Sequence, residues 1–98
     1  MLIRIANGTA ALEAPEDLKR FKLVVSGGLE GAGLQQALGA AGRLEGEHVW
    51  VSPTWLADAS GRGTDAGWLE EFGRMVGFAA KQGWVNDAGE IRAHIERE

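Results

Sequence analysis

The chain of 98 residues contains no cysteine, no tyrosine and no long hydrophobic run. Without cysteine, neither a disulfide framework nor a thiolate zinc site can form. A membrane-spanning helix needs about 18 consecutive apolar residues, and no run in this sequence approaches that length. The apolar segment 1–5 meets polar Asn7 before it reaches the roughly 7–15 apolar residues of a secretory signal. We therefore expect a soluble cytoplasmic protein with no membrane partner.

The sequence also lacks a cluster of positive charge. Its 14 acidic and 10 basic residues give a net charge of −4, and both signs are spread along the chain. The one short basic segment, 19–22, is flanked by Glu16 and Asp17. A nucleic-acid-binding protein usually concentrates Lys and Arg on one surface to displace the counterions of the phosphates. We therefore expect no nucleic-acid partner.

The composition is that of a single folded domain. Hydrophobic residues make up 45% of the chain, which is close to the globular average of about 45–50%. Two domains of roughly 50 residues would each have a thin core. No repeat, linker or low-complexity stretch divides the sequence, so we expect residues 1–98 to form one compact α+β domain.

Segments of alternating or β-branched residues predict the strands of a small sheet. The best of them, 47–52, directs Val49 and Val51 to one face and Trp50 to the other. Large apolar groups on both faces favour a central position for this strand. The dipeptide 7–8, Asn-Gly, is the strongest two-residue hairpin signal because both residues tolerate positive φ. We expect strands near 2–6, 21–26, 47–52 and 91–96, with a further candidate at 9–13 as the return strand of a hairpin.

The C-terminal segment 87–96 has two interpretations. Apolar and polar residues alternate over 91–95, as in a half-buried strand. An acidic variant of a capping box at the start of the segment instead favours a helix. We favour the strand, which a turn at 86–89 would allow to pair with 84–85.

Apolar residues at helical spacing predict two main helices. Residues 30–43 carry one narrow apolar stripe that several glycines interrupt. Residues 66–82, capped by Asp65, carry a broader stripe. Shorter helices are expected at 15–20 and 53–59, where a proline stands at the first helical position. We therefore predict a two-layer α+β sandwich, in which a small mixed or antiparallel sheet has the two main helices on one face.

No segment carries a complete catalytic or nucleotide-binding motif. The glycine-rich loop 27–33 lies between a predicted strand and a predicted helix, where phosphates often bind. The dinucleotide-binding motif is incomplete because Gln36 occupies the position of its last glycine. The P-loop motif is incomplete because Leu34 occupies the position of its lysine. Ser26 is not a nucleophile elbow, because that motif needs glycine where this chain has Val24. We therefore expect no cofactor.

The two histidines, His48 and His94, are the candidates for catalysis. Neither belongs to a close metal-ligand pair, so we expect no metal site. The simpler interpretation is structural, with His48 hydrogen-bonded beside Trp50 and His94 on a solvated strand face. If the fold placed both imidazoles in one cleft with Trp50, a general acid–base or ligand site would result.

Tryptophan is abundant for a chain of this length, with 4 residues. We expect Trp68 in the core, and Trp50 and Trp84 there as well. Trp55, early in a short helix, is a candidate pocket wall or interface anchor, because tryptophan is enriched at binding hot spots. A core position is still favoured for Trp55, since a small domain gains stability from each aromatic ring that it buries.

The predicted helix 66–82 also carries a candidate contact surface. Phe78 stands apart from the apolar stripe, among polar residues, and an exposed Phe there indicates a second contact. Gly73 and Gly77 are one turn apart at the edge of the stripe, so another backbone could approach them closely. Cover by the short helix or by a chain terminus would explain Phe78 as well.

These observations leave two functions open. We expect a small non-enzymatic binding or accessory protein that acts through protein–protein contacts, as a homodimer or with a protein partner, at Phe78, Gly73 and Gly77. The alternative is a small-molecule-binding protein or small enzyme that uses a cleft of His48, Trp50 and His94. This alternative requires both imidazoles on the same side of the sheet and beside a concave pocket.

Overall fold

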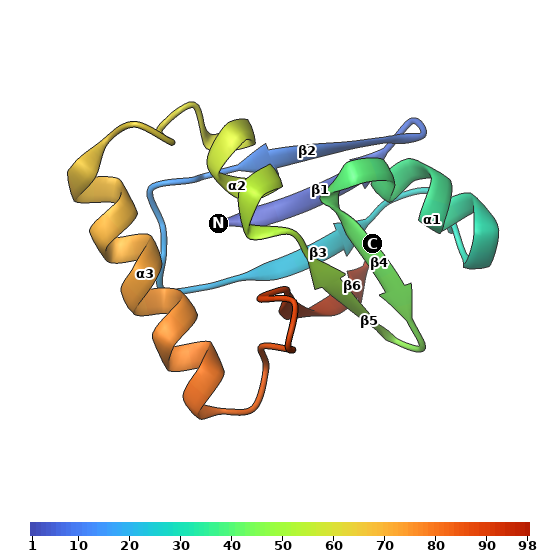
Figure 1. Ribbon diagram of the computed structural model, residues 1–98. Coiled ribbons are helices and arrows are strands. Elements are labelled where there is room, and N and C mark those ends of the chain that lie inside the picture. Colours follow the sequence, from blue (N-terminus) through green and yellow to red (C-terminus); the bar gives the residue numbers. More distant parts are fainter.

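The computed structural model describes all 98 residues and builds one six-stranded mixed sheet with three α-helices around it (Figure 1). The α+β class predicted from the sequence is therefore confirmed. The strands are β1 (Leu2–Ala6), β2 (Thr9–Glu13), β3 (Lys22–Val25), β4 (Gly42–Glu45), β5 (His48–Val51) and β6 (Ile91–Arg97). The helices are α1 (Gly31–Leu38), α2 (Pro53–Ser60) and α3 (Ala66–Lys81), and a short 3-10 turn covers Gly39–Ala41.

The strands lie in the order β2-β1-β3-β6-β5-β4. The central pairs β1–β3 and β3–β6 are parallel, and the outer pairs β1–β2, β6–β5 and β5–β4 are antiparallel. Asn7 and Gly8 close the first hairpin with φ of 54° and 75°, so the turn and the return strand expected there are confirmed. The strand β5 lies between two neighbours, as its two apolar faces predict.

The predicted layers differ from the observed ones. The sheet curls like a half-barrel, and its three helices do not share one flat layer (Figure 1). Helix α1 packs on β1, β2 and β4, and α2 packs on β2 and the 3-10 turn, while α3 runs along the side of the sheet (Figure 1). The sheet has six strands, where we predicted four and one further candidate at 9–13. The right-handed twist of adjacent strands accumulates over all six into the curl.

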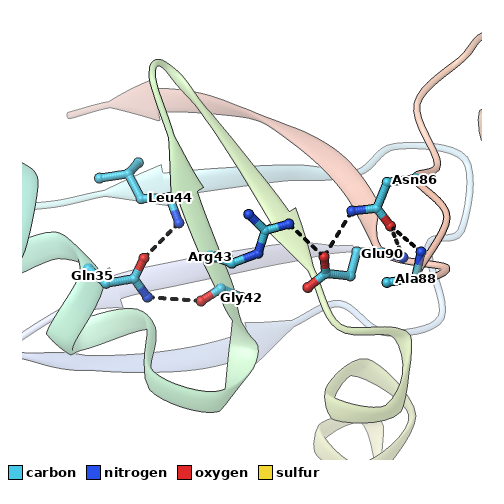
Figure 2. A network of polar contacts seen from close by, with 7 residues as sticks. All are labelled: Gln35, Gly42, Arg43, Leu44, Asn86, Ala88 and Glu90. Carbon is cyan, nitrogen blue, oxygen red and sulfur yellow. Dashed lines mark hydrogen bonds and ion pairs between the residues drawn. The ribbon is translucent and has the colours of Figure 1, made fainter.

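One predicted helix does not form, and another is shorter than predicted. No helix forms at 15–20, where the chain only turns, although Pro15 and the acids after it are typical of a helix start. The helix predicted over 30–43 ends at Leu38, because Gly39 adopts a φ of 53°. The chain then continues as β4. The side chain of Gln35 fixes this junction, since it donates to the Gly42 carbonyl at 3.0 Å and accepts from the backbone N–H of Leu44 at 2.7 Å (Figure 2).

The other helix predictions hold. The N-terminus of α2 is capped by the Ser52 hydroxyl, which accepts from the Trp55 backbone N–H at 3.2 Å. The Asp65 carboxylate caps α3 in the same way and accepts from the Trp68 backbone N–H at 3.0 Å. None of the three helices combines the length and the apolarity that crossing a bilayer requires.

The core lies on one face of the sheet, which we call the inner face. Strand residues of this face are fully or almost fully buried: Ile3, Ile5, Leu23, Val25, Val49, Val51, Ile91 and Ala93. The alternate residues point to the outer face, where Arg4 bridges Glu13 and Glu98 at 2.7 Å each. Lys22 pairs with Glu96 at 2.8 Å on the same face. The predicted shared face of Val49 and Val51 and the predicted alternation over 91–95 agree with this arrangement.

Helix α3 is held by a narrower apolar face than its sequence predicts. Only Trp68, Phe72 and Ala79 are buried, while Leu69 is 40% exposed. The Trp68 ring stacks on Phe72, with centroids 4.9 Å apart. Its indole Nε1 donates to the Pro15 carbonyl at 2.9 Å. The expected core position of Trp68 is therefore confirmed.

Candidate functional site

The candidate functional site lies where strands β3 and β6 separate. Strand β6 pairs with β5 over 91–94 but pairs with β3 only from Ile95 onward. On the β3 side of its first residues, β6 is instead bridged by Val85, opposite Ile91. Between these two pairings no strand lies beside Ala93 and His94, and α3 passes nearby. A cavity occupies this fork.

The cavity has a volume of about 320 Å³ and draws its wall from α3, β5, β6 and two connecting segments. We call it the histidine pocket. The apolar residues of its wall are Leu18, Phe21, Met75, Phe78, Ala79, Trp84 and Ile91, and the polar residues are Lys19, His48, Arg92 and His94. Pockets that bind small molecules are concave and mostly apolar with a few polar groups, and they begin at about 300 Å³. The histidine pocket has this character and stands near the lower end of that range.

The fold brings His48 and His94 together. They are direct cross-strand partners in the antiparallel β5–β6 pair, and their side chains both line the pocket. Directly opposed residues have Cβ atoms about 4.5–5.5 Å apart on the same face of a sheet. The geometric condition that the sequence set for a shared cleft, with both imidazoles on one side of the sheet beside a concave pocket, is thus met.

The other two candidates for ligand binding lie outside the pocket wall. Trp50 lies on the outer face two ladder positions from His48, opposite Arg92 of β6. It is half-buried there and not in the core, because strand alternation sends it to the face opposite Val49 and Val51. Trp55, in α2, is half-buried and packs against the core.

Trp84 and Phe78 form the aromatic part of the wall that reaches the solvent. Trp84 is 37% exposed and Phe78 is 59% exposed, and their rings meet edge to face with centroids 6.2 Å apart. The core position expected for Trp84 is wrong. Its backbone N–H closes the end of α3 by donating to the Ala79 carbonyl at 2.9 Å, and the side chain then lies over Phe78 at the pocket. The predicted exposure of Phe78 is confirmed.

A polar network fixes the turn that follows Trp84 (Figure 2). The Glu90 carboxylate accepts from Asn86 Nδ2 and from Arg43 Nη2, both at 2.9 Å. Asn86 Oδ1 in turn accepts from the backbone N–H of Glu90 at 2.9 Å and of Ala88 at 3.1 Å. The turn at 86–89 was predictable from its Asn and Gly residues, but its connection to β4 through Arg43 was not.

This network lowers the pKa of Glu90 below its ordinary value of 4.5, mainly through the hydrogen bond from Asn86 and then through that from Arg43. Hydrogen bonds from Arg4 to Glu98 and from Lys22 to Glu96 lower the pKa of those two carboxyls as well. A carboxyl with a lowered folded-state pKa stabilises the fold at pH values above its unfolded pKa. That stability is lost as the pH falls from about 4.5 through the lower folded-state pKa.

The melting temperature is therefore expected to fall on acidification below pH 4.5, the ordinary carboxyl value, and to fall less steeply in Glu90→Gln. Glutamine keeps an oxygen acceptor for Asn86 and Arg43 but has no proton to bind in this range. Circular dichroism melts between about pH 7 and pH 3 measure the effect. Identical pH profiles for both proteins would show that the network does not act through the charge of Glu90.

The remaining candidates lie away from the pocket. Gly73 and Gly77 face open space, because an added Cβ would meet no atom within 4 Å at either. The close backbone approach that their spacing permits is therefore not made within the chain. The loop 27–33 turns through Gly27 and Gly28, both with positive φ, and Arg97 Nη1 donates to its Leu29 carbonyl at 2.8 Å.

Sequence reasoning missed most of the wall. Lys19, Phe21 and Arg92 belong to the site, and only their place in the fold reveals it. No group of three or more metal-ligating side chains gathers anywhere in the fold. Comparison with family models, curated proteins and solved structures finds no match.

Proposed function

We propose that this protein is a small-molecule-binding protein and that the histidine pocket is its site. The observation that carries the proposal is the convergence of His48 and His94, from distant parts of the chain, on one cavity of about 320 Å³ with aromatic walls. A cavity of this size accommodates a ligand of one or two rings, since drug-sized ligands occupy pockets of about 300–1,000 Å³.

Binding is favoured over catalysis by the chemistry of the wall. Apart from the two imidazoles, its polar side chains are Lys19 and Arg92, and it contains no serine, threonine, aspartate or glutamate. The pocket therefore offers no hydroxyl nucleophile and no carboxylate to orient an imidazole as a base. What it offers is apolar area from Phe21, Phe78 and Trp84 next to a small polar surface.

The test uses three probes that share a naphthalene ring: naphthoate, naphthalenemethanol and naphthylmethylamine. At least one of them is expected to shift the backbone amide signals of His48, His94 and Trp84 in NMR spectra. Phe78→Ala is expected to weaken the binding about tenfold, because the ring contact it removes is worth roughly 1.4 kcal/mol.

The matched control is Leu69→Ala. Leu69 lies on the same helix and is similarly exposed, at 40% against 59% for Phe78, but it is not part of the pocket wall. Its removal is expected to leave probe binding unchanged. The proposal is contradicted if none of the three probes shifts the pocket amides, or if both variants weaken binding equally.

Self-association is a second candidate, supported by the exposed Phe78 and by the open space over Gly73 and Gly77. In this proposal the protein is a cytoplasmic homodimer, or has a protein partner, with those residues at the interface. Tumbling rates from the same NMR spectra test self-association, because a dimer tumbles more slowly than a monomer and all of its amide signals are broader. Exchange between monomer and dimer would additionally broaden the signals of Gly73 and Gly77.

A further inference from the structure

We infer that the ligand of the histidine pocket is a small carboxylate with an aromatic or branched aliphatic body, an inference that rests on the proposed function. The chain as a whole has a net charge of −4. Yet every polar side chain in the wall carries basic nitrogen: Lys19, His48, Arg92 and His94. The pocket is thus a local concentration of positive charge in an acidic protein, which favours an anion.

The two cationic side chains of the pocket, Lys19 and Arg92, form no ion pair within the protein. The ion pairs of the fold engage Arg4, Lys22, Arg43 and Arg74, and neither Lys19 nor Arg92 takes part in any of them. The planar guanidinium of Arg92 can donate two parallel hydrogen bonds to a carboxylate, which an ammonium group cannot do. Arg92 is therefore the side chain that we assign to the head of the ligand.

Two acidic side chains close to the pocket already have basic partners of their own. Glu90, next to the wall in sequence, is bound by Arg43 at 2.9 Å, and Glu96 is bound by Lys22 at 2.8 Å. Glu45 pairs with His48 from β4 but is not part of the wall.

The two kinds of side chain in the wall match the two ends of such a ligand. Strands β5 and β6 contribute the basic side chains of His48, Arg92 and His94, and α3 and the segment after it contribute Met75, Phe78 and Trp84. A ligand with a carboxylate at one end can therefore place its ring against the aromatic wall while its head faces Arg92. A purely inorganic anion would leave the aromatic wall uncovered, which is why we assign an organic carboxylate.

Comparison of the three naphthalene probes tests the inference, because they share the ring and carry an anionic carboxylate, a neutral hydroxymethyl group and a cationic aminomethyl group, respectively. Naphthoate is expected to bind at least about tenfold more tightly than naphthalenemethanol, as a charge-assisted hydrogen bond implies, and naphthylmethylamine more weakly than either. Raising the salt concentration from about 0.05 to 0.5 M is expected to reduce this preference. Inorganic phosphate is expected not to compete.

Arg92→Gln is expected to reduce the preference for naphthoate over naphthalenemethanol by about tenfold. Lys19→Gln is expected to reduce it by a smaller factor. Arg62→Gln removes one positive charge from an exposed loop outside the wall and is expected to change nothing. Amide spectra of each variant confirm that it is folded.

The outcomes separate this inference from the proposed function. If the alcohol or the amine binds in the pocket as tightly as naphthoate, the carboxylate assignment is overturned and the binding site stands. The same holds if Arg62→Gln has the effect of Arg92→Gln, or if phosphate displaces naphthoate. If no probe binds in the pocket, the proposed function fails and the inference fails with it.

Discussion

Replacement of Trp68 by alanine is expected to lower the free energy of unfolding by about 3–5 kcal/mol, the usual cost of removing a large aromatic side chain from a core. Trp68 is only 6% exposed and stacks on Phe72 at a centroid distance of 4.9 Å. Its Nε1 also donates to the Pro15 carbonyl at 2.9 Å, so the variant leaves a cavity and an unpaired acceptor at the same place.

The large effect follows from how little else holds α3. Besides Trp68, only Phe72 and Ala79 of this helix are buried. The same helix supplies Met75, Phe78 and Ala79 to the histidine pocket. A chain in which α3 has lost its anchor is therefore expected to lose naphthoate binding as well as stability.

Two companion variants make the result specific. Trp68→Phe keeps a ring to stack on Phe72 and loses mainly the hydrogen bond to Pro15, so it is expected to cost about 1–2 kcal/mol. Leu69→Ala, at an exposed neighbouring position, is expected to cost less than about 0.5 kcal/mol. Urea unfolding followed by tryptophan fluorescence or circular dichroism measures all three. A loss below about 1 kcal/mol in Trp68→Ala would mean that other contacts dock α3.

Gly42→Ala is expected to destabilise the fold by about 1–3 kcal/mol, the usual cost of overpacking. A Cβ at this position would lie 2.5 Å from the Trp50 carbonyl oxygen and 2.9 Å from Val49 Cγ1. Both contacts are to β5, with which Gly42 pairs opposite Val51. The backbone of Gly42 is extended, with φ of 176°, so the cost is one of space and not of backbone conformation.

Gly77→Ala is the matched control, with the opposite expected sign. Position 77 lies inside α3, has no positive φ and faces open space. Alanine there is expected to stabilise the fold by about 0.5–1 kcal/mol through its higher helix propensity. Urea unfolding of both variants checks the pair. An unchanged free energy of unfolding in Gly42→Ala would contradict the close packing of β4 on β5. A lower free energy of unfolding in Gly77→Ala would indicate that a partner covers this face of α3.

Local patterns in the sequence predicted several elements correctly. Asn7-Gly8 identified the first hairpin, and at 91–95 the alternation proved a better guide than the competing capping-box signal, since the segment forms β6. The strand β4 was missed because the apolar spacing of the preceding helix continues to Ala41, while the strand itself has four residues, with Gly42 at its start. Helix α1 ends because Gly39 adopts a positive φ. A glycine permits this conformation but does not require it, so the sequence alone does not predict the end of the helix.

The site was less predictable than the strands because it depends on register and topology. That His48 lies opposite His94 follows from the pairing of β5 with β6, and a shift of one residue would have sent one imidazole to the inner face. Phe21 and Arg92 share the wall only because β3 and β6 separate before Ile95. No spacing along the chain contains that information.

The most direct test of the central claim is a naphthoate titration followed by NMR. The chain has only 2 histidines, so their imidazole signals can be followed together with the indole signals of the tryptophans. If the histidine pocket is the ligand site, the signals of His48, His94 and Trp84 will shift together with one dissociation constant. The indole of Trp55, outside the pocket wall, will not move. A shift of Trp55 without the histidines, or no shift of either imidazole at saturating naphthoate, would contradict the account.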